Sequence, residues 1–140
     1  MNLAVNNGVR LGDFEKMFKA ALRHRDNADY EKALAIFQQL RKRRPKSASV
    51  HAILGDVYWR QNRLKEAVGS FRRATKLSPG SELASLGLYH TLRESGQNKE
   101  AQAEMARFLA LAPSKEYAAI LKKSPVRKSP LKKPNWAGAK

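Results

Sequence analysis

The sequence predicts an all-α protein built from three stacked helical hairpins. The first observation behind this prediction is a period, because Pro45, Pro79 and Pro113 are equally spaced along the chain. The second is the pattern between the prolines, where runs of about a dozen residues carry apolar side chains at helical spacing. Each proline follows such a run, as expected of a residue that cannot continue a helix. We therefore expect six helices, paired as three hairpins.

The same period holds in four further columns of the sequence. These columns contain small or large apolar residues that suit positions between packed helices, namely Ala33, Ala67 and Ala101; Phe37, Phe71 and Met105; Leu40, Ala74 and Phe108; and Ala20, Leu54 and Leu88. Five columns without a gap predict three repeats, over residues 14–47, 48–81 and 82–115.

The stretch from Ala48 to Pro79 shows the pattern of one repeat most clearly. It carries, in order, Leu54-Gly55, Tyr58, Ala67, Phe71, Ala74 and the closing Pro79. This order resembles the tetratricopeptide repeat, a helix–turn–helix unit of about 34 residues. The resemblance implies a short superhelix of hairpins whose first helices line a concave binding surface.

In the first repeat, Asp13 is expected to cap a helix that begins at Phe14, because its carboxylate can accept hydrogen bonds from exposed N–H groups. Asn27-Ala28-Asp29 is expected to form the turn, and the second helix to run from Tyr30 to Arg43. In the second repeat, the polar break between the two helices is Gln61-Asn62-Arg63.

In the third repeat, Ser81 is expected to cap a helix from Glu82 to Ser95. Gly96 then allows the turn, and a second helix should run from Lys99 to Leu111.

Tyr89 departs from the repeat, because Ala21 and Gly55 occupy the same column. A tyrosine there should push the paired helices apart unless Gly87 or Ala101 makes room.

The remaining segments flank the repeats. Residues 1–13 are a lead-in, and residues 115–123 fit a short capping helix that would complete a repeat domain over 14–123. Residues 124–140 are rich in proline and lysine and contain no acid, a composition that predicts a disordered basic tail.

Composition limits the classes of function. The chain has no cysteine, which excludes disulfides, thiol catalysis and cysteine-based zinc sites. Neither a secretory signal nor an apolar run long enough to cross a bilayer is present, so we expect a soluble, cytoplasmic protein. The net charge of +16 suggests attraction to an acidic partner.

No arrangement of residues predicts catalysis, a cofactor or a metal site. His24, His51 and His90 lack the spacing of metal ligands, and two of them fall in columns of packed residues. A glycine-rich phosphate loop and a nucleophile elbow are also missing. We therefore expect a protein that is not an enzyme and that binds another protein, as an adaptor or assembly chaperone.

The resemblance assigns the concave groove to particular columns of the first helices. Carried over to this sequence, the residues expected to contact a partner are Phe18, Leu22, Arg25, Asp56, Trp59, Arg60, Leu86, His90 and Arg93. Because arginine pairs with carboxylates and stacks on aromatic rings, the expected partner is a segment with acidic and apolar side chains. On this interpretation, Trp59→Ala and Arg93→Glu should weaken binding without unfolding the protein.

One specialisation of the family does not fit. Its repeats that grip the acidic C-terminal tails of heat-shock chaperones use lysine, asparagine and arginine at five positions. The matching residues here are Phe18, Leu22, Ile53, Leu83 and Gly87. None is polar, so a carboxylate clamp of that kind is excluded.

The alternative function is association with nucleic acid or another polyanion. Ser124-Pro125 and Ser129-Pro130 each precede basic residues and resemble the units of chromatin-type tails. The residues expected to contact phosphates are Arg41, Lys42, Arg43, Arg44, Arg127, Lys128, Lys132 and Lys133. Whether the short stack pairs with a second copy is left open by the sequence.

Overall fold

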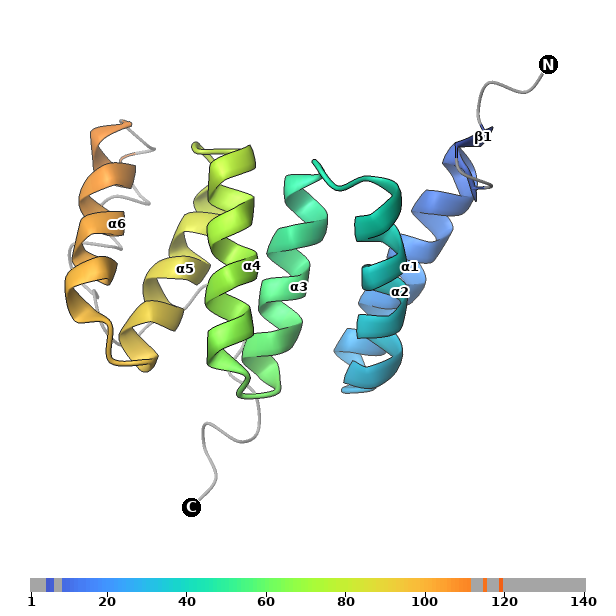
Figure 1. Ribbon diagram of the computed structural model, residues 1–140, viewed down its shortest axis with the longest axis horizontal. Helices are drawn as coiled ribbons and strands as arrows, with labels where there is room; N and C mark the ends of the chain where they lie inside the picture. The colour runs from blue at the N-terminus through green and yellow to red at the C-terminus, as the bar shows by residue number, and fades with distance from the viewer. Residues whose placement is uncertain (1–4, 7–8, 112–114, 116–118, 120–140) are drawn as a thin grey trace.

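The computed structural model describes residues 5–6, 9–111, 115 and 119. Within the continuous stretch 9–111, six helices follow one another: α1 (Leu11–Asp26), α2 (Tyr30–Arg43), α3 (Ala48–Arg60), α4 (Leu64–Leu77), α5 (Glu82–Glu94) and α6 (Asn98–Ala110). They form three consecutive hairpins side by side (Figure 1). The predicted all-α fold is thereby confirmed.

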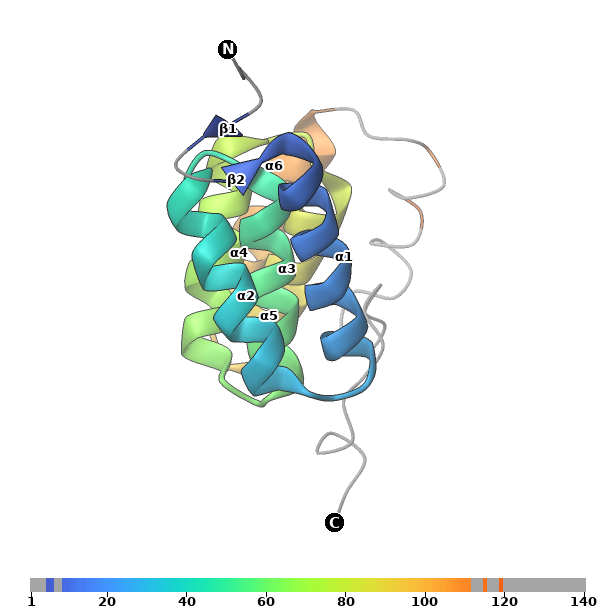
Figure 2. The ribbon, with the colours of Figure 1, turned by 90° about the vertical axis from the view of Figure 1, so that its right-hand side faces the viewer.

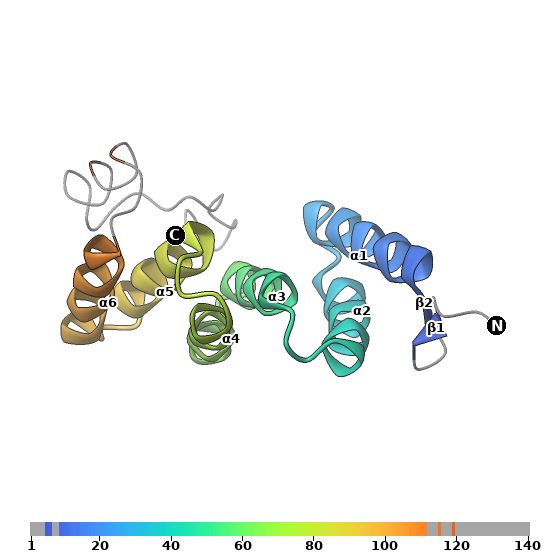
Figure 3. The same ribbon diagram turned by 90° about the horizontal axis from the view of Figure 1, so that it is seen from above.

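The helices are arranged in two layers. Seen from above, α1, α3 and α5 form one layer and α2, α4 and α6 the other (Figure 3). In the first layer α3 lies recessed between α1 and α5, so that this layer is concave. Seen along the stack, the helices of both layers run roughly parallel or antiparallel to one another (Figure 2). The first helices of the hairpins therefore share one face, as the repeat resemblance implied.

The N-terminal boundary of the first hairpin was predicted wrongly. The helix α1 begins at Leu11, and Asp13 lies within its first turn instead of capping a helix that begins at Phe14. A carboxylate in the first turn still favours the helix, because it faces the positive end of the helix dipole. Two short antiparallel strands, β1 (Val5–Asn6) and β2 (Val9–Arg10), precede α1 within the region expected to be only a lead-in.

The later helix boundaries agree closely with the sequence. Ser81 caps α5, because its hydroxyl accepts a hydrogen bond from the N–H of Ala84 at 3.2 Å. Ser47 caps α3 in the same way, through the N–H of Val50 at 3.4 Å. The capping helix expected over 115–123 lies outside the described residues except for Lys115 and Ala119. The predicted tail, 124–140, also lies outside them, and the division into domains stays a prediction.

Each hairpin turn contains one residue with left-handed backbone. These residues are Ala28 (φ 64°), Asn62 (φ 60°) and Gly96 (φ 83°), which lie one repeat apart. Glycine adopts this conformation without penalty and asparagine with little, but alanine is rarely found in it. The first turn therefore carries backbone strain that the other two avoid.

We predict that Ala28→Gly stabilises the protein. Left-handed backbone costs an alanine about 1–2 kcal/mol, whereas the greater freedom of glycine in the unfolded chain costs about 0.5–1 kcal/mol. The free energy of unfolding should rise by roughly 0.5–1 kcal/mol in urea denaturation. The reverse change in the third turn, Gly96→Ala, serves as the matched control and should lower it. A lower free energy of unfolding for Ala28→Gly than for the parent would contradict the inferred backbone strain at Ala28.

The core of the second and third repeats is organised around the ring of Phe71, which is fully buried on α4. A Cβ atom added at Gly55 on α3 would lie 2.8 Å from Cγ of this ring, and one added at Gly87 on α5 would lie 2.5 Å from Cε1. Both distances are too short for real contacts. The ring therefore occupies space that exists only because both facing helices carry a glycine.

The packing around Phe71 also shows how the third hairpin accommodates Tyr89. The side chain is 1% exposed and belongs to the same core as Phe71, with its ring edge-on to His90 at 5.1 Å. The space left by Gly87 is filled by Phe71, so Gly87 does not make room for the tyrosine. The third hairpin accommodates Tyr89 as a core residue.

We predict that Gly87→Ala destabilises the protein. Overpacking a core costs about 1–3 kcal/mol, which exceeds the roughly 1 kcal/mol that alanine gains over glycine in a helix. Urea unfolding followed by circular dichroism should show a lower midpoint. Gly69→Ala on α4 is the control, because an added Cβ there meets nothing within 4 Å. That variant should be more stable than the parent, and equal behaviour of the two variants would refute the packing argument.

Candidate functional site

An apolar pocket of about 260 Å³ opens between the first helices of all three repeats. Phe18 comes from α1, Ile53 from α3 and Leu83 from α5, and small residues complete the lining: Ala48, Ser49, Ala52, Ser78 and Ser81. The stacking of the hairpins therefore brings one large apolar residue from each repeat to the same place.

The residues of this pocket are held in place but not covered. Phe18 packs edge-on against Phe37 of α2, with ring centroids 5.6 Å apart, so its orientation is fixed by the first hairpin. Phe18 and Ile53 are half-buried, whereas Leu83 is 41% exposed. A large apolar side chain that stays exposed beside a hollow marks a surface suited to an apolar partner.

Three of the pocket residues occupy positions that match those of the carboxylate clamp discussed above. Phe18, Ile53 and Leu83 all match clamp positions. Of these, only Phe18 was predicted as a groove residue, and Ile53 and Leu83 were missed. The sequence feature that could have identified Ile53 and Leu83 is the absence of polar residues at the clamp positions. This feature indicates that an apolar group of the partner is recognised at the same place.

Charged residues gather at the other end of the concave face, around the buried carboxylate of Asp56. Its Oδ2 accepts a hydrogen bond from Nη1 of Arg25 at 2.9 Å, and its Oδ1 accepts one from Nε of Arg60 at 3.0 Å. Arg25 also pairs with Asp26 at 2.8 Å. The guanidinium of Arg25 is thus paired within α1, with Asp26, and across to α3, with Asp56.

Trp59 likewise serves the interior of the stack. Its side chain is fully buried, and its Nε1–H donates a hydrogen bond to Oε1 of Glu94 at 2.8 Å. This bond joins α3 to α5. The sequence predicted Trp59 as a partner-contacting residue of the groove, whereas its indole ring lies within the core cluster of the second and third repeats.

The other predicted groove residues divide by exposure. Leu86 and His90 are buried, whereas Leu22 and Arg93 are half-buried. Burial raises the pKa of the Tyr89 phenol above its usual value, and the neighbouring Arg93 guanidinium opposes this shift. Arg93 therefore lies at the edge of the core, beside the buried tyrosine.

The residues of the basic block at the end of α2 have different surroundings. Arg41 lines a cleft between α2 and α4, whereas the guanidinium of Arg44 stacks on the ring of Phe14 at 3.7 Å from its centroid. Lys42 is exposed and Arg43 is half-buried. Arg127, Lys128, Lys132 and Lys133 lie outside the described residues. The phosphate contacts expected from the sequence stay a prediction.

Two absences apply to the part of the chain that the structure describes. Within it, no group of histidine and acidic side chains is arranged to hold a metal ion. No helix there has the length and apolar character required to span a membrane.

We predict that Trp59→Ala destabilises the protein instead of acting on binding alone. Replacing a buried large aromatic side chain by alanine costs about 3–5 kcal/mol, because it leaves a cavity. Thermal or urea unfolding should show this loss, whereas Arg93→Gln, at the half-exposed edge of the same face, should change stability by less than about 0.5 kcal/mol. An unchanged unfolding midpoint for Trp59→Ala would place the indole outside the core.

Comparison with known proteins supports the repeat assignment. The tetratricopeptide repeat family profile matches residues 18–82. Among solved structures, MamA (AMB-1) superimposes with a TM-score of 0.64 at 20% sequence identity. The match covers 76% of this chain and 60% of the MamA chain, so this protein spans less than two thirds of MamA. The search of curated proteins gave no match. With the equally spaced repeats of the sequence and the three hairpins, these matches support a tetratricopeptide repeat protein.

Proposed function

We propose that the protein is a non-catalytic adaptor or assembly chaperone that holds a segment of a partner protein on its concave face. The repeat family and the fold support a protein-interaction scaffold in general. The observation that carries the more specific proposal is the apolar pocket, to which each of the three repeats contributes one large side chain. It accepts an apolar anchor residue, since removal of apolar surface from water is the main driving force of such contacts.

The partner segment also reaches the charged end of the face. Arg60 lies seven residues after Ile53 on α3, which corresponds to about 10 Å at a rise of about 1.5 Å per residue. An extended chain covers this distance in about three residues. The proposed motif therefore has an apolar anchor and an acidic side chain about three residues apart.

Arg60 and Arg93 are the residues proposed to receive the acidic side chain. Arg60 uses Nε to bind Asp56, which leaves the two terminal nitrogens of its guanidinium for a carboxylate. Arg25 contributes less, because both Asp26 and Asp56 already pair with it. The buried residues Trp59 and Asp56 act indirectly by fixing the positions of the helices that carry the contacts.

The nucleic-acid alternative stays a hypothesis. It rests on the basic block at the end of α2 and on the basic tail, which lies outside the described residues.

We predict that Leu83→Glu weakens partner binding by about tenfold or more, because it places a charge beside the apolar pocket. The measurement has two stages. Proteins cross-linked to the tagged full-length chain are first co-purified after nuclease treatment. The affinity of the recovered partner is then measured by calorimetric titration. Leu111→Glu is the matched control, since Leu111 is also an exposed leucine, 50% accessible, but does not line the pocket. A partner bound equally by both variants would place its binding surface elsewhere.

A further inference from the structure

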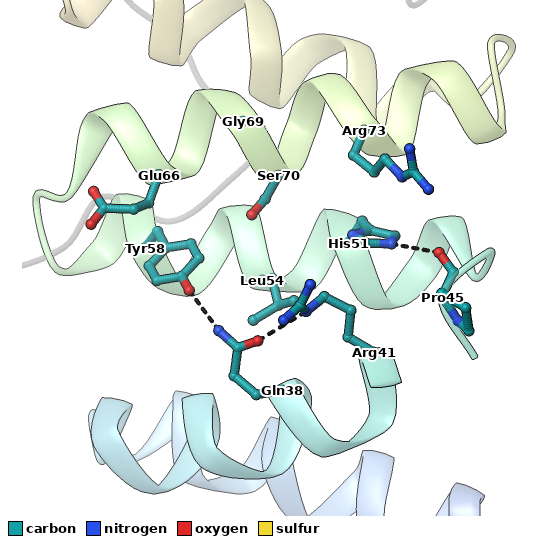
Figure 4. Close-up of a pocket in the computed structure, with 10 residues that line it drawn as sticks. All are labelled: Gln38, Arg41, Pro45, His51, Leu54, Tyr58, Glu66, Gly69, Ser70 and Arg73. Carbon is teal, nitrogen blue, oxygen red and sulfur yellow. Dashed lines mark hydrogen bonds between the residues drawn. The ribbon is translucent and has the colours of Figure 1, made fainter. Parts of the chain in front are cut away.

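A second cleft lies on the opposite face of the stack, between α2 and α4. Its volume is about 460 Å³, which falls in the range of about 300–1,000 Å³ typical of ligand sites. Figure 4 shows α3 as its floor, with Leu54 and Tyr58 at the bottom and side chains of α2 and α4 on the two walls. The lining of this cleft shares no residue with the concave pocket.

The cleft exists because one wall lacks a side chain. Gly69 lies in the middle of α4, and a Cβ atom added there would meet nothing within 4 Å. Its neighbour Ser70 is small and also faces the cleft. Glycine in a helix interior costs stability of about 0.5–1 kcal/mol relative to alanine. Gly69 therefore leaves space in the cleft wall at a position where alanine would stabilise the helix.

One wall of the cleft is ordered by a chain of hydrogen bonds. Nε of Arg41 donates to Oε1 of Gln38 at 2.9 Å, and Nε2 of Gln38 donates to the hydroxyl of Tyr58 at 2.8 Å. The bond to Gln38 fixes the direction of the Arg41 side chain but uses only one of its nitrogens. The terminal nitrogens of this guanidinium are left for a bound group.

The end of the cleft near Arg41 is positively charged. Arg73 of α4 lines the facing wall and forms no ion pair with any residue that the structure describes. His51 is held nearby, because its Nε2 donates to the carbonyl oxygen of Pro45 at 2.8 Å. Two guanidiniums from different repeats thus face one space, an arrangement that suits carboxylate or phosphate oxygens.

The other end of the cleft carries the carboxylate of Glu66. Arg63 donates to it at 3.0 Å and holds its pKa below the usual range, so that Glu66 is ionised near neutral pH. A nucleic-acid strand would bring a phosphate toward this carboxylate, because it carries a negative charge at every nucleotide. A peptide avoids this repulsion, since it can offer N–H groups here and carboxylates at the other end.

We propose that this cleft on the face formed by α2 and α4 is a second docking site, which binds a short acidic segment of a partner protein. Its acidic side chains pair with Arg41 and Arg73, an apolar side chain fills the hollow beside Gly69 above Leu54, and its backbone N–H groups point toward Glu66. The two faces of the stack then recognise two different segments, which suits a protein that brings partners together.

The test is a titration of a pool of fluorescein-labelled octapeptides with the full-length protein. Fluorescence anisotropy of the peptides reports binding. Each peptide has two glutamates or aspartates beside two leucines or phenylalanines, with glycine or serine elsewhere. The double variant Arg41→Gln/Arg73→Gln should bind the pool about tenfold or more weakly, because hydrogen bonds between charged groups are lost. Gly69→Gln should also weaken binding, because its side chain occupies the hollow without straining the helix.

The matched control is Lys42→Gln/Lys76→Gln. It also removes two positive charges, one from α2 and one from α4, at exposed positions that do not line the cleft. The affinity of this variant should stay within about twofold of the parent, as expected where exposed charges act only through screened long-range attraction. In a Leu83→Glu background, where the concave pocket is impaired, the loss caused by Arg41→Gln/Arg73→Gln should persist, which separates this site from the one proposed above.

Four outcomes would overturn the proposal. Equal losses in the two double variants would show attraction by net charge alone. Unchanged binding in Arg41→Gln/Arg73→Gln, or no binding of the pool by the parent, would show that the cleft takes no acidic peptide. A single-stranded RNA oligonucleotide that binds through Arg41 and Arg73 when the peptides do not would assign the cleft to nucleic acid.

Discussion

The structure of this protein depends on the insertion of one aromatic ring between two helices that carry glycine. Phe71 of α4 meets the backbone of α3 at Gly55 and that of α5 at Gly87, at distances that no larger residue permits. Because interiors are close-packed, such a contact fixes the separation and tilt of all three helices. The position of the third repeat relative to the second follows from it, and so does the concave pocket, which needs Ile53 of α3 and Leu83 of α5 side by side.

Polar contacts also join the first helices of neighbouring repeats. Asp56 binds arginines of both α1 and α3, and Trp59 of α3 donates to Glu94 of α5. Buried polar groups are costly unless they are paired, so each of these contacts favours one alignment of neighbouring repeats. The charged end of the concave face is therefore largely a structural device. In the proposed function, recognition is left to the apolar end and to the donors of Arg60 that do not bind Asp56.

The two faces of the stack present different chemistry to a partner. The concave face offers an apolar hollow with contributions from three repeats, whereas the opposite face offers a cleft with two arginines at one end and a glutamate at the other. Stacked hairpins produce this difference naturally, because first and second helices contribute to opposite layers. A small scaffold can in this way hold two unlike segments without a second domain.

The sequence by itself determined the fold, because the repeat period and the helical spacing of apolar residues are properties that can be read along the chain. It also determined the caps and turns that depend on a single residue, such as Ser81 and Gly96. Only the tertiary structure decided which side chains remain available for a partner. Trp59 and Asp56 occupy groove columns, yet the neighbouring repeat supplies Glu94 and Arg25 as their partners. Leu83 and Gly69 look ordinary in the sequence, and they matter because helices from other repeats leave space beside them. The exposure and pairing of a side chain depend on residues about 30 or more positions away in the sequence. A local sequence pattern therefore carries no information about its exposure or its partner.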